Sequence, residues 1–392
     1  MPERTVIKPL NVMMSCLAFI SGGAVTYMRN LAPLLYEHFQ KAPEGHRLKF
    51  LAHEEQKEQL QSVDASQIVW LRQARPTGYA RMFWEYWHLP DILNEGQIDV
   101  FFTPYQVGPR IRGPKHVMMI RNMEPFLHNR YRYSVANRLR NHLLRLASVK
   151  SLRGADRVIA VSKYVRRFLI HAVGIEAERI HMIYHGRNLH LTPTIEGCRD
   201  REALAGIGVG KEYLLTCGSL LPYRRCEDII AAFNICCEFL GPAVQLAIAG
   251  SGTDRRYAAL IDEMIASSPY KDRILLLGNV PWETVAALYR NCLVCVIATE
   301  VEACPNIAIE AMSAGCAVVS SQCPPVREIF QGCALEYRAR DPLDLSRQIK
   351  RFIEDSDLCR EFNNRAVARA EAFSWEKCAR ATYSALVDWE EK

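Results

Sequence analysis

The 392-residue sequence contains no run that approaches the roughly 20 apolar residues a helix needs to cross a bilayer. Its start, Met1 to Leu10, has charges and a proline but lacks an apolar stretch before a small-residue cleavage site, so it predicts no signal peptide. Low-complexity tracts and short-period repeats are also missing. These absences argue against a membrane-spanning chain or a repeat architecture, and they predict a cytoplasmic protein.

Metal-binding patterns are missing as well. Most of the 14 cysteines lie within apolar runs, where a cysteine behaves as a small hydrophobic residue, which predicts free thiols in a reducing compartment. Cys292 and Cys295 form a Cys-x-x-Cys pair, but neither a second pair nor histidines at ligand spacing follow it. Packing within a strand is therefore favoured over a zinc site. No aspartate motif indicates another metal, and we expect neither a metal nor a cofactor.

What the sequence does contain is a regular alternation of strand-like and helix-like segments. Apolar runs of strand length alternate with amphipathic stretches, which is typical of parallel sheets flanked by helices. The expected strands are 10–16, 47–52, 67–71, 99–103, 116–120, 157–162, 213–217, 244–249, 274–277, 293–298 and 317–320. The sequence predicts helices between them, among them 25–39, 133–153, 227–239, 255–265 and 375–389.

The alternation lapses once, between Asn188 and Gly210, where proline, glycine and polar residues predict a linker. We therefore expect an α/β protein with two Rossmann-like domains, 1–188 and 189–374, facing each other across a cleft. The final segment, 375–392, predicts a helix that packs back across one of the domains, and the sequence does not decide which. Sheets of this type bind ligands at the carboxyl ends of their strands.

The most informative segment runs from Thr299 to Ser320, TEVEACPNIAIEAMSAGCAVVS. Glu302 and Glu310 lie eight positions apart, separated by a turn whose proline suits the first turn of a helix. The free N–H groups that begin such a helix, from about Asn306 and Ile307, favour a phosphate because the helix dipole adds positive potential there. Two carboxylates therefore flank a predicted phosphate site and can hold hydroxyl groups on either side of it.

This segment closely resembles the signature of glycosyltransferase family 4, which has the GT-B fold. The resemblance implies a retaining transferase that uses a nucleotide-diphosphate sugar. It also implies that Glu302 faces the donor sugar and that Glu310 holds the ribose hydroxyls. An ordinary solvated helix with surface acids is the alternative, and the length of the match weighs against it.

A second segment, Gly218 to Phe233, follows a strand and precedes a helix. The family usually has Gly-Arg here and a basic residue five positions later, both of which contact the diphosphate. This chain has Ser219 in place of the arginine and Arg224 as the later cation, with Arg225 beside it. The planar guanidinium of Arg224 suits phosphate oxygens. For Arg225 two interpretations are equally supported: it replaces the missing arginine at the diphosphate, or it is a solvated residue at the start of a helix.

Two glycine loops complete the resemblance on the donor side. Gly22 and Gly23 follow the first strand and match the family's Gly-Gly-x-x-x-Tyr with Tyr27, which implies close approach of backbone to a phosphate. Gly250 lies in the segment Ala-Gly-Ser-Gly after a later strand and resembles the family's second glycine loop. That loop lacks the third glycine of a dinucleotide fingerprint, so a nicotinamide cofactor is not favoured.

The acceptor side matches less completely. Asn122 stands where many members of the family have a histidine near the reacting carbon, and its amide can orient a hydroxyl but cannot act as a base. His185 and Gly186 resemble the family's Pro-Asn-Gly segment at the interdomain hinge. For His185, a hinge residue held by hydrogen bonds is at least as well supported as a catalytic base.

The expected reaction is hexose transfer to a hydroxyl of a glycan or lipid-linked acceptor, with Glu302, Arg224 and Asn122 as catalytic candidates. No acidic nucleophile stands out, so we expect front-face displacement rather than a covalent sugar. A nucleotide-sugar epimerase or sugar phosphorylase of the same fold and an inactive module that binds nucleotide sugar or glycan remain alternatives. Polysaccharide or glycolipid synthesis is the expected setting.

Positive charge is concentrated between Arg121 and Arg167, which carries twelve basic and two acidic residues, a net charge of +10 against +6 for the whole chain. Three interpretations are open: a solvated face, a nucleic-acid surface and a surface for anionic lipid. No nucleic-acid motif accompanies the segment, so no nucleic-acid partner is expected. The alternation of arginines with leucines at helical spacing slightly favours docking at the inner face of a membrane over a solvated face.

Overall fold

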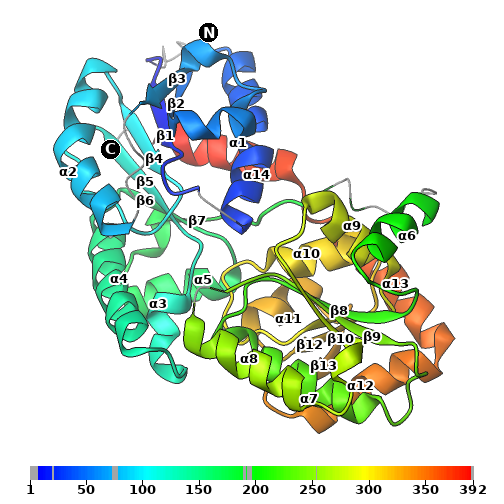
Figure 1. Ribbon diagram of the computed structural model, residues 1–392. Helices are drawn as coiled ribbons and strands as arrows, with labels where there is room; N and C mark the ends of the chain where they lie inside the picture. The colour runs from blue at the N-terminus through cyan, green and yellow to red at the C-terminus, as the bar shows by residue number, and fades with distance from the viewer. Residues whose placement is uncertain are drawn as a thin grey trace. The chain divides into compact units, whose positions relative to one another are not determined.

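The computed structural model describes residues 8–19, 22–72, 78–188, 191, 197–252 and 254–389. The chain divides into two compact units, each built around one parallel sheet (Figure 1). The first comprises Met1–Asn122, Leu143–Gly186 and Ser374–Lys392, and the second comprises Met123–His142 and Arg187–Phe373. The predicted α/β class with two parallel sheets is therefore confirmed.

The seven strands of the first unit pair only in parallel. Their order across the sheet is β3 (Ile68–Leu71), β2 (Arg47–His53), β1 (Asn11–Ser15), β4 (Val100–Thr103), β5 (Lys115–Ile120), β6 (Arg157–Ala160) and β7 (Ile180–Met182). Helices cover both faces of such a sheet, and its central strands are therefore continuous apolar runs. Strand β4, for example, is buried at all four positions.

Helix α2 (Gly78–Glu95) and the part of α4 (Val135–Gly154) that belongs to this unit, from Leu143 on, lie on the same face of this sheet. Helix α2 joins β3 to β4 and α4 lies between β5 and β6, so both connections run in the same direction across the strand order. Because parallel crossovers are right-handed, both helices fall on one face, and α1 (Gly23–Lys41) falls on the other. Figure 1 shows this separation, with α2 and α4 on the left.

Two further helices complete this unit, α5 (Lys163–Phe168) and α14 (Trp375–Val387). The sequence left open where the last helix packs. The structure places α14 against α1, and the ring of Tyr383 meets that of Phe39 edge to face at 4.9 Å between centroids.

The six strands of the second unit are also parallel, in the order β10 (Ile274–Gly278), β9 (Gln245–Ala249), β8 (Tyr213–Cys217), β11 (Val294–Ile297), β12 (Val318–Ser321) and β13 (Leu335–Tyr337). Its helices include α3 (Glu124–Leu127), α6 (Gly197–Gly206), α7 (Cys226–Cys236), α8 (Arg255–Ser267), α9 (Trp282–Asn291), α10 (Asn306–Ser313), α11 (Pro324–Phe330), α12 (Pro342–Glu354) and α13 (Ser356–Ala370).

One sequence expectation needs correction. The segment predicted as a linker, 188–210, contains helix α6. Its Asp200 accepts two hydrogen bonds of 2.7 Å from the guanidinium of Arg290 on α9. The helix has only a weak apolar pattern of its own, and this contact with a residue distant in the sequence anchors it. Residues 189–190 and 192–196 lie outside the described part of the chain.

Both sheets reverse their strand order once, between β1 and β4 in the first unit and between β8 and β11 in the second. At such a point the loops that leave the two neighbouring strands turn to opposite sides and leave room for a ligand at the carboxyl edge. In the second unit these are the loops that carry the Gly218–Arg225 and Thr299–Pro305 motifs. The topology thus brings together two motifs about eighty residues apart.

Candidate functional site in the second unit

The loops after β8 and β9 approach each other so closely that glycine is required. A Cβ atom built on Gly250 would stand 1.9 Å from the carbonyl oxygen of Gly218, and one on Gly252 would stand 1.9 Å from that of Leu220. Gly218 and Gly250 also have φ angles of 129° and 137°, which side chains rarely tolerate. The Gly250 loop thus supports the loop that presents Ser219 and Arg224. Its own predicted contact with a donor stays a prediction.

Arg224 and Glu302 form an ion pair at the point where the strand order reverses. Arg224 ends a short 3-10 turn after β8, and Glu302 lies between β11 and α10. Their side chains are only 20% and 10% exposed. Burial raises the pKa of Glu302 above its usual value, although Arg224 and Thr299 both act to lower it. The chain therefore holds a largely buried cation and a carboxylate together where its two signature motifs meet.

A small cavity of about 20 Å³ adjoins this pair. Its lining includes Gly218, Ser219 and Arg224 from the first loop and Thr299 and Ile307 from the second motif. The structure therefore brings together several of the predicted donor-binding residues. The hydroxyl of Ser219 is in hydrogen-bonding contact with that of Tyr223, which lowers the pKa of Tyr223, although burial raises it overall to about 12.

Glu310 lies within helix α10, and its carboxylate accepts a hydrogen bond of 3.4 Å from the hydroxyl of Tyr289. Burial raises the pKa of Glu310 to about 7, while Tyr289 and Arg224 act to lower it. Asn306 and Ile307 are the first two residues of α10, as the motif predicted, and no acidic residue lies in its first turn. The short helix α10 therefore provides both the free N–H groups at its start and the carboxylate of Glu310.

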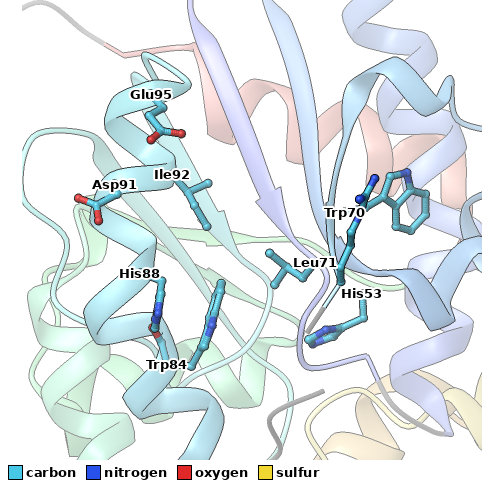
Figure 2. Close-up of a pocket in the computed structure, with 9 residues that line it drawn as sticks. His53, Trp70, Leu71, Trp84, His88, Asp91, Ile92 and Glu95 are labelled. Atoms are coloured by element: carbon cyan, nitrogen blue, oxygen red, sulfur yellow. The ribbon is translucent and has the colours of Figure 1, made fainter. Parts of the chain in front are cut away.

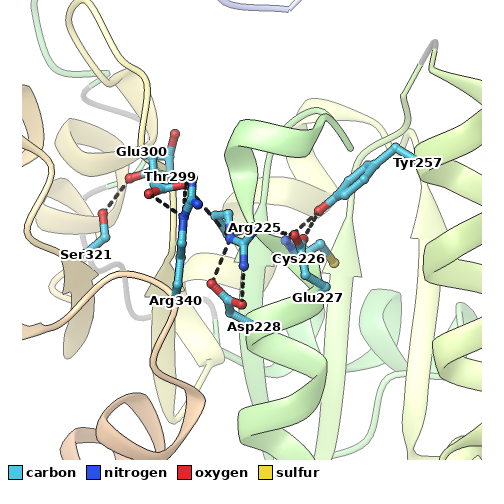
Figure 3. A network of polar contacts seen from close by, with 9 residues as sticks. All are labelled: Arg225, Cys226, Glu227, Asp228, Tyr257, Thr299, Glu300, Ser321 and Arg340. Carbon is cyan, nitrogen blue, oxygen red and sulfur yellow. Dashed lines mark hydrogen bonds and ion pairs between the residues drawn. The ribbon is translucent and has the colours of Figure 1, made fainter. Parts of the chain in front are cut away.

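Arg225 forms hydrogen bonds and ion pairs with neighbouring carboxylates (Figure 3). It adopts the left-handed conformation at φ 54° and donates hydrogen bonds of 2.9 and 2.7 Å to Asp228. Glu227 lies 2.6 Å away, and Glu300 at 3.9 Å links it to Arg340. These contacts fix the start of α7, so Arg224 rather than Arg225 is the better candidate for a diphosphate. The role of Arg225 in donor binding stays a prediction.

Three predicted site residues of the first unit lie at the start of α1 and just after β5. Gly22 caps the start of α1 with φ 57°, Gly23 is its first residue, and a Cβ atom on Gly22 would meet nothing within 4 Å. Asn122 is exposed just after β5, and its carbonyl oxygen accepts a hydrogen bond of 2.8 Å from Gln106. The open backbone at Gly22 suits close approach by a ligand. The binding roles of all three residues stay predictions.

His185 is packed among aromatic rings. Its ring stacks on Trp375 at 5.8 Å between centroids and lies 5.1 Å from the ring of Tyr27. The next residue must be glycine, because a Cβ atom on Gly186 would stand 2.2 Å from the backbone nitrogen of Trp375. This tight packing against the start of α14 favours a structural role for His185 over a catalytic one.

The first unit also contains a cavity that the sequence did not indicate (Figure 2). Its volume is about 370 Å³, and it lies between the ends of β2 and β3 and one side of α2. Trp84 stacks on His88 at 5.0 Å with the rings nearly parallel, and the lining also includes two acidic residues further along α2, Asp91 and Glu95. The remaining lining residues are His53, Trp70, Leu71, Arg72 and Ile92. Aromatic faces with neighbouring carboxylates are a suitable surface for a sugar ring and its hydroxyls.

Sequence reasoning also missed Tyr289, which contacts Glu310, and Tyr223, whose ring lies 5.5 Å from the Arg224 guanidinium. Both lie in patterns that an ordinary core residue would produce, so no local signal could have singled them out. Among the described residues, no three His, Cys, Asp or Glu side chains lie close enough together to hold a metal ion. None of the described helices has the length and apolar character needed to cross a membrane.

Comparison with known protein families identifies two matches that together span most of the chain. The family described as "Glycosyl transferases group 1" matches residues 202–369, and the one described as "Glycosyltransferase Family 4" matches residues 21–191. The first match contains both loops of the Arg224–Glu302 pair. The second contains the Gly22–Gly23 loop, Asn122 and His185.

Individual relatives are distant. A D-inositol 3-phosphate glycosyltransferase of Nocardia farcinica is 25% identical over 60% of this chain. A Campylobacter jejuni N-acetylgalactosaminyltransferase, named for a diphospho-undecaprenol acceptor, is 25% identical over 58% of this chain. The matched regions span 54% and 58% of these two proteins. Among solved structures, the Anabaena protein HepE in complex with UDP and glucose superposes with a TM-score of 0.74 at 16% identity, covering 97% of this chain and all of that one.

Proposed function

Because this chain belongs to the family 4 glycosyltransferases with the GT-B fold, we propose that it transfers a hexose from a nucleotide-diphosphate sugar to a hydroxyl of a glycan or lipid-linked acceptor, with retention of configuration. The observation that carries this proposal is the largely buried Arg224–Glu302 pair at the reversal point of the second sheet. A module that binds only glycan has no need of a largely buried cation beside a helix start, and turnover of the donor separates the transferase from an inactive module that binds nucleotide sugar.

In this proposal the second unit binds the donor. Arg224 and the N–H groups at the start of α10 bind the diphosphate, since guanidinium and helix dipole both favour negative charge. Glu310 accepts hydrogen bonds from the ribose hydroxyls, and Glu302 accepts them from the donor sugar. The Arg224–Glu302 pair rearranges when donor enters, so that the guanidinium exchanges part of its contact with Glu302 for phosphate oxygens.

Catalysis then consists of positioning and charge stabilisation. The bond between the anomeric carbon and the diphosphate oxygen breaks, while the acceptor oxygen forms a bond to the same face of that carbon. The departing diphosphate takes the proton of the acceptor hydroxyl. Arg224 and the α10 start stabilise the charge that develops on the diphosphate, so we propose that neither a metal nor a cofactor takes part.

The acceptor is proposed to bind in the first unit. The cavity beside α2 offers stacked Trp84 and His88 for a sugar face, and Asp91 and Glu95 for its hydroxyls. The Campylobacter relative is named for an acceptor on a polyprenol diphosphate, which supports a lipid-linked acceptor and a peripheral position on the inner face of a membrane. Cell-surface polysaccharide or glycolipid synthesis is the proposed setting.

A thermal-shift panel with the common nucleoside diphosphates tests the donor site, beginning with UDP because the Anabaena structure contains it. A ligand at 100 times its Kd adds about 2.7 kcal/mol to the free energy of unfolding. We expect one nucleotide to raise the midpoint in the wild type, Glu310→Ala to abolish that rise, and Glu263→Ala, an exposed change on α8, to leave it intact.

A panel in which no nucleotide stabilises the wild type at millimolar concentration would contradict the proposed donor site. If one nucleotide does bind, its hexose conjugate is then supplied with candidate acceptors, and the anomeric configuration of the product is read by NMR. Inversion of configuration would overturn the proposed retaining reaction. Binding without turnover of donor would favour the sugar-binding module.

A further inference from the structure

The apolar face of the amphipathic helix α4 is exposed. Four apolar residues at helical spacing have exposed fractions between 43% and 85%. They are Val135, Leu139, Leu143 and Leu146. The residues of α4 that are buried are Asn141, Ser148 and Leu152. A helix that packs on a sheet normally buries its apolar stripe. Here the apolar stripe faces away from the protein and the buried face is largely polar or small.

Basic residues border this stripe. Helix α4 carries five of them and no acidic residue, and all five are exposed: Arg138, Arg140, Arg145, Lys150 and Arg153. An exposed apolar stripe bordered by arginine and lysine is the pattern of helices that lie in the interface of a bilayer. Long basic side chains there reach the headgroups while their stems remain with the apolar residues.

Helix α2 exposes a second apolar group, made of aromatic residues. Phe83, Tyr86 and Trp87 are each at least 60% exposed. Their rings nevertheless contact one another, with Trp87 at 6.2 Å from Phe83 and 5.4 Å from Tyr86 between centroids. Tryptophan and tyrosine are enriched at membrane interfaces, where an apolar ring and a polar edge are both accommodated.

The loop between β4 and β5 joins the two helices into one surface. On one side, the backbone of Gly108 exchanges hydrogen bonds of 3.3 and 2.9 Å with the hydroxyl of Ser151 on α4. On the other side, Ile111 packs against the apolar cluster that contains Leu89 and Leu93 of α2. The same loop exposes Arg110 and Arg112 and contains no acidic residue. The aromatic residues of α2, the basic loop and the part of α4 from Leu143 on therefore follow one another on one face of the first sheet.

We infer that this surface, formed by α2, the 104–114 loop and α4, docks the protein on a bilayer that contains anionic phospholipid, with the leucines and aromatic rings inserted below the headgroups. The positive charge of α4 and the loop complements anionic headgroups. It disfavours a second copy of this chain, because a twofold interface would bring the same basic face against itself. The inference gives the proposed membrane acceptor its location, and its test does not depend on the donor site.

Co-sedimentation with vesicles tests the inference, using phosphatidylcholine alone and with about one third phosphatidylglycerol at moderate salt. We expect the wild type to bind only the anionic vesicles. The triple change Leu139→Ser, Leu143→Ser and Leu146→Ser should lower the partition coefficient about tenfold or more, because it removes three apolar side chains from the interface. The matched control Leu260→Ser, Leu276→Ser and Leu343→Ser removes three comparably exposed leucines outside this surface and should bind as the wild type does.

Two further measurements distinguish the contribution of positive charge from the insertion of apolar side chains into the bilayer. Changing Arg110, Arg112 and Arg145 to Gln should lower the partition coefficient by roughly tenfold to a hundredfold, since each cation near the surface contributes about fivefold. Brominated acyl chains should quench Trp87, and the quenching should fall in Trp87→Phe. Equal binding to neutral and anionic vesicles, or no loss in the leucine triple, would overturn the inference. So would a wild-type dimer that the leucine triple dissociates.

The nucleotide-induced thermal shift is measured on the same variants. If the vesicle results hold but no nucleotide binds, the proposed donor site fails and the docking surface remains. If nucleotide binding is intact in every variant and vesicle binding is absent in the wild type, only the docking surface fails. Unchanged unfolding midpoints without ligand show that the leucine and arginine variants are folded.

Discussion

The two units have the same architecture and use their side chains in opposite ways. In the second unit, charged groups converge inside: Arg224 and Glu302 are paired and largely buried, and burial raises the pKa of Glu310 to about 7. In the first unit, apolar side chains are exposed on α2 and on the part of α4 that belongs to it. Buried, paired charge suits a small, highly charged ligand, whereas an exposed apolar face with a basic border suits an extended partner.

The difference shows that fold alone does not assign function to either unit. Both sheets reverse their strand order once and so offer the same kind of place for a ligand. What distinguishes them is which side chains the loops and outer helices carry. Four experiments test this contrast between the units, and they are given in order of decreasing expected effect.

Removal of the cation of the second unit should have the largest effect. Arg224→Met should lower kcat/KM for donor by about 10²- to 10³-fold, as loss of a group that stabilises the leaving charge does elsewhere. It also leaves Glu302 without its partner, so the free energy of unfolding should fall by about 3 kcal/mol. Steady-state kinetics and urea unfolding measure the two effects. Arg255→Met, an exposed change on α8, should change neither, and wild-type kinetics in Arg224→Met would remove the charge-stabilising role.

Gly250→Ala should destabilise the second unit by about 3 kcal/mol or more. The new methyl group would collide with the carbonyl oxygen of Gly218 and would also require an unfavourable backbone conformation. Gly206→Ala, where a Cβ atom meets nothing within 4 Å, is the control and should stay within about 0.5 kcal/mol of the wild type. Urea unfolding compares the two. A stable Gly250→Ala protein would show that the loops after β8 and β9 are not as tightly packed as described.

Nucleotide affinity should fall as pH falls through about 7, by up to tenfold per pH unit. Glu310 has a pKa raised to about 7 by burial, and only its carboxylate form accepts hydrogen bonds from two ribose hydroxyls. The free protein should respond in the opposite direction: between pH 4.5 and 7 the folded state holds this proton and the unfolded state releases it, so Glu310 makes stability fall as pH rises across this window.

Titration calorimetry across pH 5.5 to 8.5 measures the affinity, and Glu310→Gln is the matched control. The glutamine variant should bind more weakly at pH 8 and should lose the part of the pH dependence that belongs to the protein. The part that remains belongs to the phosphate groups of the nucleotide. Identical pH profiles for the two proteins would show that the protonation state of Glu310 does not affect nucleotide affinity.

The smallest effect is expected in the cavity of the first unit. Asp91→Asn with Glu95→Gln should raise the KM for a soluble acceptor about fivefold, because exposed carboxylates contribute about 1 kcal/mol in hydrogen bonds to sugar hydroxyls. The KM for donor should not change. Asp262→Asn with Glu263→Gln, two exposed acids of α8, is the control. A larger effect on donor than on acceptor would break the division of labour between the units.

Much of the fold was predictable from the sequence, because periodicity and turn residues are local signals. The strand 213–217 was predicted at its observed bounds, and most other strands to within one or two residues. The segment around α6 was predicted wrongly, since its helix is anchored by the contact between Asp200 and Arg290 ninety residues away, and the short strands β7 and β13 were not predicted. The donor motifs were recognisable because they are contiguous in sequence. The cavity beside α2, and the contact of Tyr289 with Glu310, arise only from packing.

Two parallel α/β units, the family and the charged residues of the two donor motifs could all be read from the sequence, because they depend on local pattern and composition. Three features depend on packing between distant segments and could not be read in this way: Arg224 pairs with Glu302, carboxylates bind Arg225, and the leucines of α4 are exposed. Helical periodicity shows that α4 has an apolar face but cannot tell which face meets the sheet. In the structure the buried residues of α4 are Asn141, Ser148 and Leu152, so the face that carries the leucines is the exposed one.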